Sequence, residues 1–134
     1  MALTSGRNTP RRSGDQFAFP VAAATTIYAG GMVTLLATGG YAVPAGTASA
    51  GVCVGMAEET VVNTGAAGDL TVPVRRGVFR YANSASGDLI ARADIGNVCY
   101  LVDDQTVAKT DNSAARKEAG VIVDVDAVGV WVRI

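Results

Sequence analysis

Histidine is absent from this 134-residue chain. It is the commonest general base near neutral pH and the commonest transition-metal ligand. Ser–His–Asp and Cys–His catalytic groupings therefore cannot form within the chain. A Ser–Lys pair is still open, but the two lysines, Lys109 and Lys117, lie in polar, turn-like contexts. We therefore predict that the protein is not an enzyme.

Long apolar runs and phosphate-binding signatures are also missing. No segment approaches the roughly 18 apolar residues that a membrane span needs, and the N-terminus lacks the charged and apolar regions of a signal peptide. Neither a GxGxxG nor a GxxxxGK[ST] pattern occurs. We therefore expect no cofactor, no membrane partner and synthesis in a cytosol.

Charge is sparse and unevenly spread. The net charge is −1, and no lysine or arginine occurs between Ser13 and Val74. Residues 1–20 carry three arginines and one aspartate, a balance of +2, which leaves −3 on the remainder. The acidic balance of that remainder disfavours nucleic acid as a partner.

Small apolar residues and glycine are abundant instead. Apolar residues make up 49% of the chain, only eight residues are aromatic, and the 16 glycines exceed the average usage of about 7%. Short valine-rich runs between turn residues indicate about eight to ten short strands. We predict an all-β fold, a compact antiparallel β-barrel or sandwich of short strands with an extended N-terminal arm. Residues 1–19 form the predicted arm and residues 20–134 a single β domain.

Three hairpins are expected from alternation and turn chemistry. The first joins residues 32–37 to 41–43 through Gly39 and Gly40. The second lies in residues 97–110, with Asp103, Asp104 and Gln105 as its turn. The third is the C-terminal pair 119–126 and 130–134, with Trp131 and Ile122 expected on one mixed face.

Other segments carry more specific expectations. In residues 50–57 the small residues share one face, which favours close coverage by another sheet or subunit. Pro73 cannot donate to a ladder, so its strand is expected at an edge or at a bulge. Residues 83–97 form a longer connection that has room for a short helical turn, and residues 112–119 are expected to form a helical turn.

The arm admits two interpretations. Its Ser, Gly, Asn, Pro and Arg residues have no regular period, as is typical of a disordered terminus. However, Phe17 and Phe19 alternate as in a strand, and a basic arm with spaced aromatics could become ordered on a partner. The predicted contact residues of the arm are Arg7, Arg11, Arg12, Phe17 and Phe19.

A second basic cluster, Arg75, Arg76 and Arg80, lies beside Phe79 and Tyr81. Interleaved cations and aromatics are typical of single-stranded nucleic-acid binding. An exposed strand face or a protein interface explains the same pattern, and we favour it because the chain is acidic overall. For contacts between subunits we expect Arg75, Arg76, Phe79 and Trp131.

Two cysteines and two pairs of aspartates are the remaining candidate functional residues. Cys53 and Cys99 lie in apolar runs, which favours buried free thiols; a disulfide would need their Cα atoms within about 7 Å. Asp103 with Asp104, and Asp124 with Asp126, supply oxygens that suit calcium, but the EF-hand spacing is missing. We therefore predict no metal site.

Three phrases of valine, glycine and turn residues mark the chain. The first runs through Gly96, Tyr100, Val102, Asp103, Asp104, Thr106 and Val107. The second runs through Ala119, Gly120, Val125, Asp126, Gly129, Val130, Trp131 and Val132. Upstream, residues 51–84 contain a G-V-x-x-G-x-A and a V-x-V-x-x-G-V-F phrase. In these phrases the chain resembles tailed-phage capsid decoration (cement) proteins.

The resemblance implies a structural virion protein of a bacteriophage with a compact β-barrel or sandwich. It implies binding to the major capsid protein on the outside of the expanded capsid, commonly as a homotrimer, which braces the shell against packaged DNA. Localisation would then be the capsid exterior of the virion, after assembly in the host cytoplasm. The arm is the least family-like part.

Other functions share this β scaffold. Another virion part, such as a head-fibre base or a tail module, would differ in where it binds. A carbohydrate-binding or adhesin-like β-module would need exposed aromatic platforms, and the few aromatics disfavour it. An enzyme would need a convergent polar cluster, for which the sequence gives no pattern.

Overall fold

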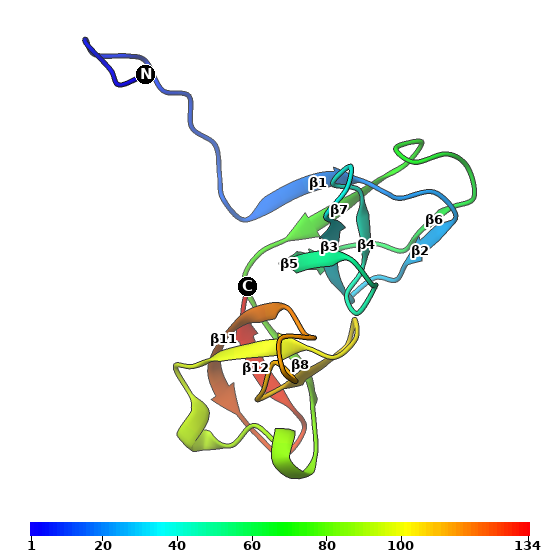
Figure 1. Cartoon of the computed structure of the whole chain (residues 1–134), viewed down its shortest axis with the longest axis vertical. Helices are drawn as coiled ribbons and strands as arrows, with labels where there is room; N and C mark the ends of the chain where they lie inside the picture. Colours follow the sequence, from blue (N-terminus) through cyan, green and yellow to red (C-terminus); the bar gives the residue numbers. More distant parts are fainter.

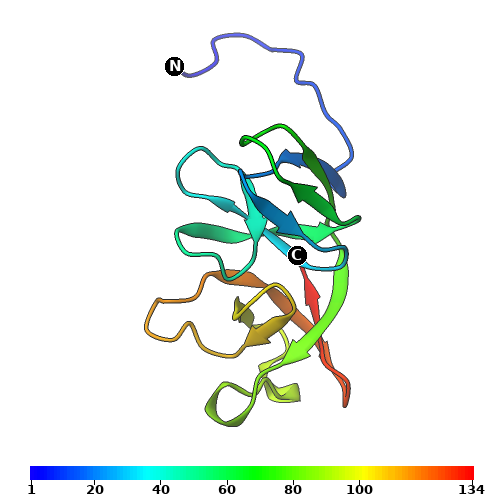
Figure 2. The ribbon, with the colours of Figure 1, turned by 90° about the vertical axis from the view of Figure 1, so that its right-hand side faces the viewer.

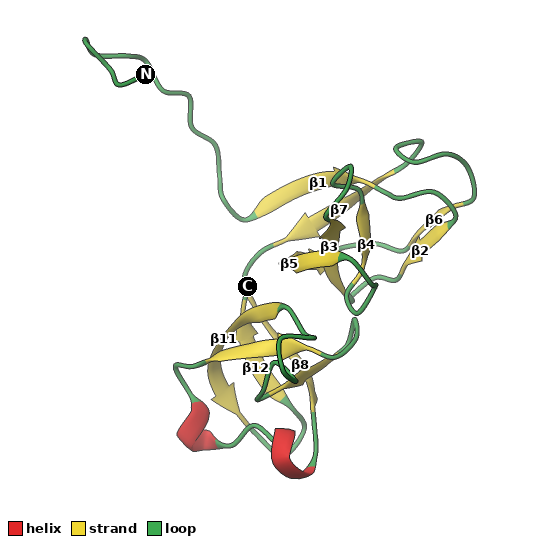
Figure 3. Ribbon diagram, in the orientation of Figure 1, coloured by secondary structure: helices red, strands yellow, loops and turns green.

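A computed structural model describes all 134 residues and shows a chain built almost entirely of strands (Figure 3). The predicted all-β class is therefore confirmed. Two single-turn 3₁₀ helices, η1 (Ser86–Asp88) and η2 (Arg92–Asp94), lie in the 83–97 connection, where a short helical turn was predicted. The strands are β1 (Gln16–Pro20), β2 (Thr25–Ile27), β3 (Met32–Leu36), β4 (Ala42–Pro44), β5 (Ala50–Ala57), β6 (Val61–Asn63), β7 (Thr71–Arg75), β8 (Val78–Asn83), β9 (Val98–Leu101), β10 (Thr106–Ala108), β11 (Glu118–Val125) and β12 (Val130–Arg133).

The strands form two lobes stacked along the long axis of the molecule (Figures 1 and 2). In the N-terminal lobe, residues 16–75, a five-stranded sheet has the order β1-β7-β5-β3-β4. A bridge between Val21 and Ala42 joins the chain after β1 to β4, so this sheet almost closes on itself. In the C-terminal lobe, residues 78–134, β10-β8-β12-β11-β9 form a closed barrel. All paired strands are antiparallel except β10 and β8, and the isolated Val21–Ala42 bridge is also parallel.

One hydrophobic cluster belongs to both lobes. Met32, Ala45 and Cys53 of the N-terminal lobe are buried with nine residues of the C-terminal lobe. The chain crosses between the lobes along β7 and β8, which are separated only by Arg76 and Gly77. The lobes are therefore packed against each other through a shared core.

The three predicted hairpins are confirmed. β3 pairs with β4, β9 with β10, and β11 with β12, all antiparallel. The β3–β4 loop closes where the Leu36 N–H donates to Tyr41 O at 2.9 Å, and within it Gly39 and Gly40 have φ values of +82° and +71°, a left-handed conformation that glycine adopts without strain. In the second turn the Gln105 N–H donates to Asp103 Oδ1 at 2.9 Å, the local bond expected of an aspartate turn.

The small-residue face of β5 is covered only in part: Cys53 and Gly55 are buried, but Gly51 is half-buried. At Gly55 the close neighbour is β7, the adjacent strand of the same sheet, rather than another sheet or subunit. Gly55 has a φ of +148°, and a Cβ there would lie 2.4 Å from Val74 Cγ1 and 2.8 Å from Arg75 O. Only glycine allows β5 and β7 to approach this closely.

The expectation for Pro73 is wrong. Its strand, β7, lies between β1 and β5 rather than at an edge. The proline ring is tolerated because β5 ends beside Pro73. The ladder between β5 and β7 includes only Met56 and Ala57 of β5. Beyond it, the Glu58 N–H donates to Pro73 O at 2.9 Å. A single ladder donor is therefore missing, at the end of the neighbouring strand.

The helical turn expected at residues 112–119 is also absent. Asn112, Ser113 and Ala114 have φ values of +50°, +56° and +67°, so the chain turns in the left-handed sense. The Arg116 N–H donates back to Asp111 O at 2.9 Å, and β11 begins at Glu118. The loop is therefore closed by a local turn without any helical repeat.

The mixed face expected for the C-terminal hairpin does not form. The register of β11 on β12 shifts between Ile122 and Asp124, so Ile122 lies opposite Val132 while Asp124 lies opposite Trp131. A bulge reverses the facing of the residues that follow it. Ile122 is therefore buried in the core, and Trp131 points to the outer side of the barrel wall.

Candidate interaction surfaces

The N-terminal arm extends away from the body (Figure 1). Arg7, Arg11 and Arg12 are all exposed, and residues 1–15 contain no strand. At its root the arm is fastened to β7: the Arg76 N–H donates to Asp15 O at 2.8 Å, and Arg75 Nη1 lies 4.0 Å from Asp15 Oδ2. Free cationic side chains are thus presented on a segment whose root is fixed.

The two phenylalanines lie in β1 instead of a free arm. Phe17 is opposite Val74 and Phe19 is opposite Val72, so both rings are on the inner face of the sheet and half-buried. The rings are stacked, with centroids 6.2 Å apart, and the Arg12 guanidinium lies 4.9 Å from the Phe17 centroid. The sheet therefore begins at Gln16, inside the segment assigned to the arm.

The other side of β1 is an open strand edge. The backbone of Asp15 and Val21 bonds to the β7 side, so by alternation Gln16, Ala18 and Pro20 point their backbone groups outward. Pro20 has no N–H, which leaves two outward donors, those of Gln16 and Ala18. Proline on an exposed edge is a common protection against unwanted strand pairing.

The four expected subunit-contact residues do not form one surface. Arg75 is partly exposed, and its Nε lies 2.8 Å from Glu58 Oε1. Arg76 is exposed at the junction between the lobes. Phe79 packs against the shared core, opposite Val132, and so faces inward. Trp131 is on the outer side of the same wall, so Phe79 and Trp131 cannot join one contact.

Trp131 is the centre of a small polar group on the barrel wall. Its Nε1 donates to Asp126 Oδ2 at 2.8 Å, and the Arg80 guanidinium lies 5.7 Å from the ring centroid. The Trp131 bond, followed by the backbone N–H groups of Val128 and Gly129, lowers the pKa of Asp126 below its ordinary value. Sequence reasoning missed the pairing of Arg80 with Trp131, since it depends on the register of β8 against β12.

The expectation of buried thiols is confirmed. Cys53 and Cys99 are both buried and free, in the core shared by the lobes. Burial penalises the thiolate and raises the pKa of Cys53 to about 11 and that of Cys99 to about 12. Both side chains therefore act as small apolar residues.

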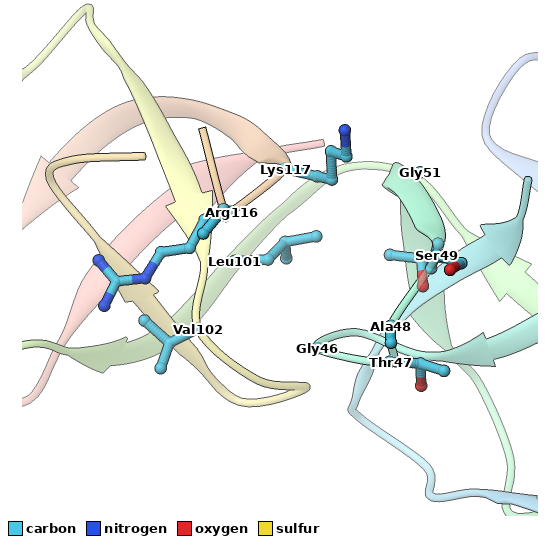
Figure 4. Close-up of a pocket in the computed structure, with 12 residues that line it drawn as sticks. Gly46, Thr47, Ala48, Ser49, Gly51, Leu101, Val102, Arg116 and Lys117 are labelled. Atoms are coloured by element: carbon cyan, nitrogen blue, oxygen red, sulfur yellow. The ribbon is translucent and has the colours of Figure 1, made fainter. Parts of the chain in front are cut away.

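A crevice of about 370 Å³ separates the β4–β5 loop from the C-terminal lobe (Figure 4). Thr47 and Ser49 line one side and Arg116 and Lys117 the other. The Arg116 guanidinium is already engaged, 3.2 Å from Asp88 Oδ2 and 3.2 Å from Thr110 O. Lys117 forms no ion pair, so the crevice offers one free cation and hydroxyl groups.

A second hollow, of about 510 Å³, is formed by two turns that are distant in sequence. It is lined by Tyr28, Gly30, Gly31, Asp104 and their neighbours Ala29 and Gln105. From the sequence, Asp104 was expected only as part of a hairpin turn. No local pattern could have paired Asp104 with Gly31, because 72 residues lie between them.

No group of three His, Cys, Asp or Glu side chains lies close enough to hold a metal ion, and no helix is long and apolar enough to cross a membrane. No protein-family model, curated protein or solved structure matches this chain.

Proposed function

We propose that the protein is a non-enzymatic structural component of a tailed-phage virion. It binds the major capsid protein on the outer surface of the expanded capsid and stabilises the shell against internal DNA pressure. The observation that carries this proposal is the basic arm, which stands out from a compact β body and whose Arg7 and Arg11 form no ion pair. The C-terminal hairpins carry the family-like phrases.

The arm suits a partner because it buries little on its own chain. Met1 and Leu3 are exposed together with Arg7 and Arg11. Such a segment loses conformational freedom only when it binds, so its affinity for one site is modest. A homotrimer carrying three arms would sum modest contacts into lasting attachment. Arg12 lies in the arm near its root, Phe17 and Phe19 lie in β1 beside that root, and Arg75, Arg76 and Trp131 remain candidates for contacts between subunits.

Co-sedimentation with capsids tests this proposal. Full-length protein is mixed with expanded capsids that lack it, and with unexpanded procapsids as the comparison. We expect saturable binding to expanded shells. Replacing Arg7 and Arg11 by alanine should weaken that binding at least tenfold. The control is Arg92→Ala, an exposed arginine in η2 that forms no ion pair. Absence of binding to every shell form would overturn the proposal.

A carbohydrate-binding β-module is the second candidate. One observation favours it: Trp131 points outward and its indole is held in place by Asp126. Because Trp131 is the only tryptophan, its fluorescence should change on titration with a glycan ligand. A chain that binds a glycan through Trp131 but binds no capsid would favour this second function.

A further inference from the structure

We propose that the hollow between the β2–β3 turn and the β9–β10 turn is a docking site for an arginine from the arm of a second copy of this chain. The hollow is lined by Tyr28, Ala29, Gly30, Gly31, Asp104 and Gln105. None of the residues that line the hollow is among the capsid contacts proposed above. The proposal therefore gives a partner to a surface that the proposed function does not use.

The chemistry of the hollow selects a planar cation. Tyr28 is 63% exposed, whereas the other seven aromatic side chains are partly or fully buried. Asp104 forms no ion pair, and its carboxylate accepts no hydrogen bond from the chain. A guanidinium stacks on an aromatic face and bonds to a carboxylate at the same time. The hollow provides both partners.

The floor of the hollow is bare backbone. A Cβ added at Gly30 would meet nothing within 4 Å, and one at Gly31 would lie 3.5 Å from Asp104 Oδ2. The carboxylate is therefore close to the glycine backbone, with open space beside it. The floor is also fastened: the Met32 N–H donates to Asp104 O, and the Gly30 N–H to Ala57 O, both at 2.8 Å. The site is thus pre-formed.

The surroundings of the hollow are acidic. Asp103 is next to Asp104 in the turn, and Glu59 lies in the neighbouring loop, where Thr60 Oγ1 accepts from the Ala29 N–H at 3.0 Å. None of these three carboxylates forms an ion pair. The field at the hollow is therefore negative, while the arm carries the unpaired cations of the chain's N-terminus.

The arm can reach a neighbouring molecule. Arg7 lies eight residues before Asp15, so an extended chain places it up to roughly 27 Å from the root. Arg11 is nearer, and neither side chain has a partner in its own chain. Because arm and hollow are different surfaces, their contact is heterologous, and it closes into a ring where the rotation between copies allows. In the absence of a shell, an arm arginine of one molecule would occupy the hollow of a second molecule.

A labelled peptide of residues 1–15 provides the first test. It is titrated into the full-length Arg7→Ala, Arg11→Ala chain, whose own arm lacks the two cations but whose hollow is intact. We expect binding that weakens as salt is raised. Adding Asp104→Asn or Tyr28→Ala to that chain should weaken peptide binding at least tenfold. The matched control is Asp124→Asn, an exposed carboxylate on the barrel wall. Equal binding by the Asp104→Asn and Asp124→Asn chains would overturn the proposal.

Sedimentation of the full-length chain identifies the occupant. We expect the unaltered chain to self-associate at low salt, and the Asp104→Asn chain and the Arg7→Ala, Arg11→Ala chain each to be monomeric at the same concentration. Mixed together, these two chains should form a complex, because one supplies the arm and the other the hollow. A monomeric unaltered chain would mean that the arm docks on its own molecule or not at all, and it would overturn the second-copy assignment. No shell is present, so this outcome is independent of the capsid proposal.

Discussion

Asn63 holds the N-terminal lobe closed, and replacing it should be one of the most costly single substitutions in the chain. Its side chain is only 2% exposed. Its Nδ2 lies 3.2, 3.0 and 3.0 Å from the carbonyl oxygens of Val21, Ala22 and Ala66, and its Oδ1 accepts from the Gly65 N–H at 3.1 Å. Val21 and Ala22 are the residues that bridge to β4 and nearly close the sheet.

The magnitude follows from the number of bonds lost. Two amide hydrogens are shared among three carbonyls and one bond is accepted, so Asn63→Ala removes about three hydrogen bonds. At about 1 kcal/mol each, the free energy of unfolding should fall by about 3 kcal/mol. Water cannot easily replace the amide, because Val21 and Ala22 are buried. The cost would therefore not be recovered by solvation.

Urea unfolding measures this loss, provided that the slope of the transition is unchanged. The control is Asn97→Ala, an asparagine whose side chain is exposed and makes no hydrogen bond within the chain. Its substitution should change stability by less than about 0.5 kcal/mol. A difference between the two variants smaller than about 1 kcal/mol would refute the assignment of Asn63 as the closing contact.

Three further predictions follow from single contacts. Tyr81→Phe should leave stability unchanged or raise it by up to about 1 kcal/mol in the same urea assay, because the buried Tyr81 hydroxyl has no hydrogen-bond partner; a clear loss would reveal a partner. Gly55→Ala should lower the thermal midpoint strongly, because its Cβ would overlap Val74 Cγ1; an unchanged midpoint would contradict the close approach of β5 and β7. The lowered pKa of Asp126 contributes stability above its unfolded-state pKa, which is lost as the pH falls through the lower folded-state pKa. Trp131 fluorescence should report that acid transition, and Asp126→Asn should remove it.

The hairpins could be predicted because their signals are local. Gly39 and Gly40 supply the left-handed turn, and the alternation of Val130 and Val132 with Trp131 sets two faces whatever the rest of the chain does. Close coverage of Gly55 was likewise readable from its strand, since small residues leave space that some neighbour must fill. The burial of Cys53 and Cys99 followed from their apolar neighbours.

Tertiary structure decided everything that depends on which strands are neighbours. Pro73 is tolerated in an interior strand because β5 ends beside it, and the bulge after Ile122 places Ile122 and Asp124 on opposite faces of the hairpin. The division into two lobes reflects which strands pair in the five-stranded sheet and which complete the closed barrel. The hollow at Tyr28 and Asp104 joins two turns from distant parts of the chain. Composition and period describe one segment at a time, whereas pairing, register and juxtaposition are set by the free energy of the whole packed chain.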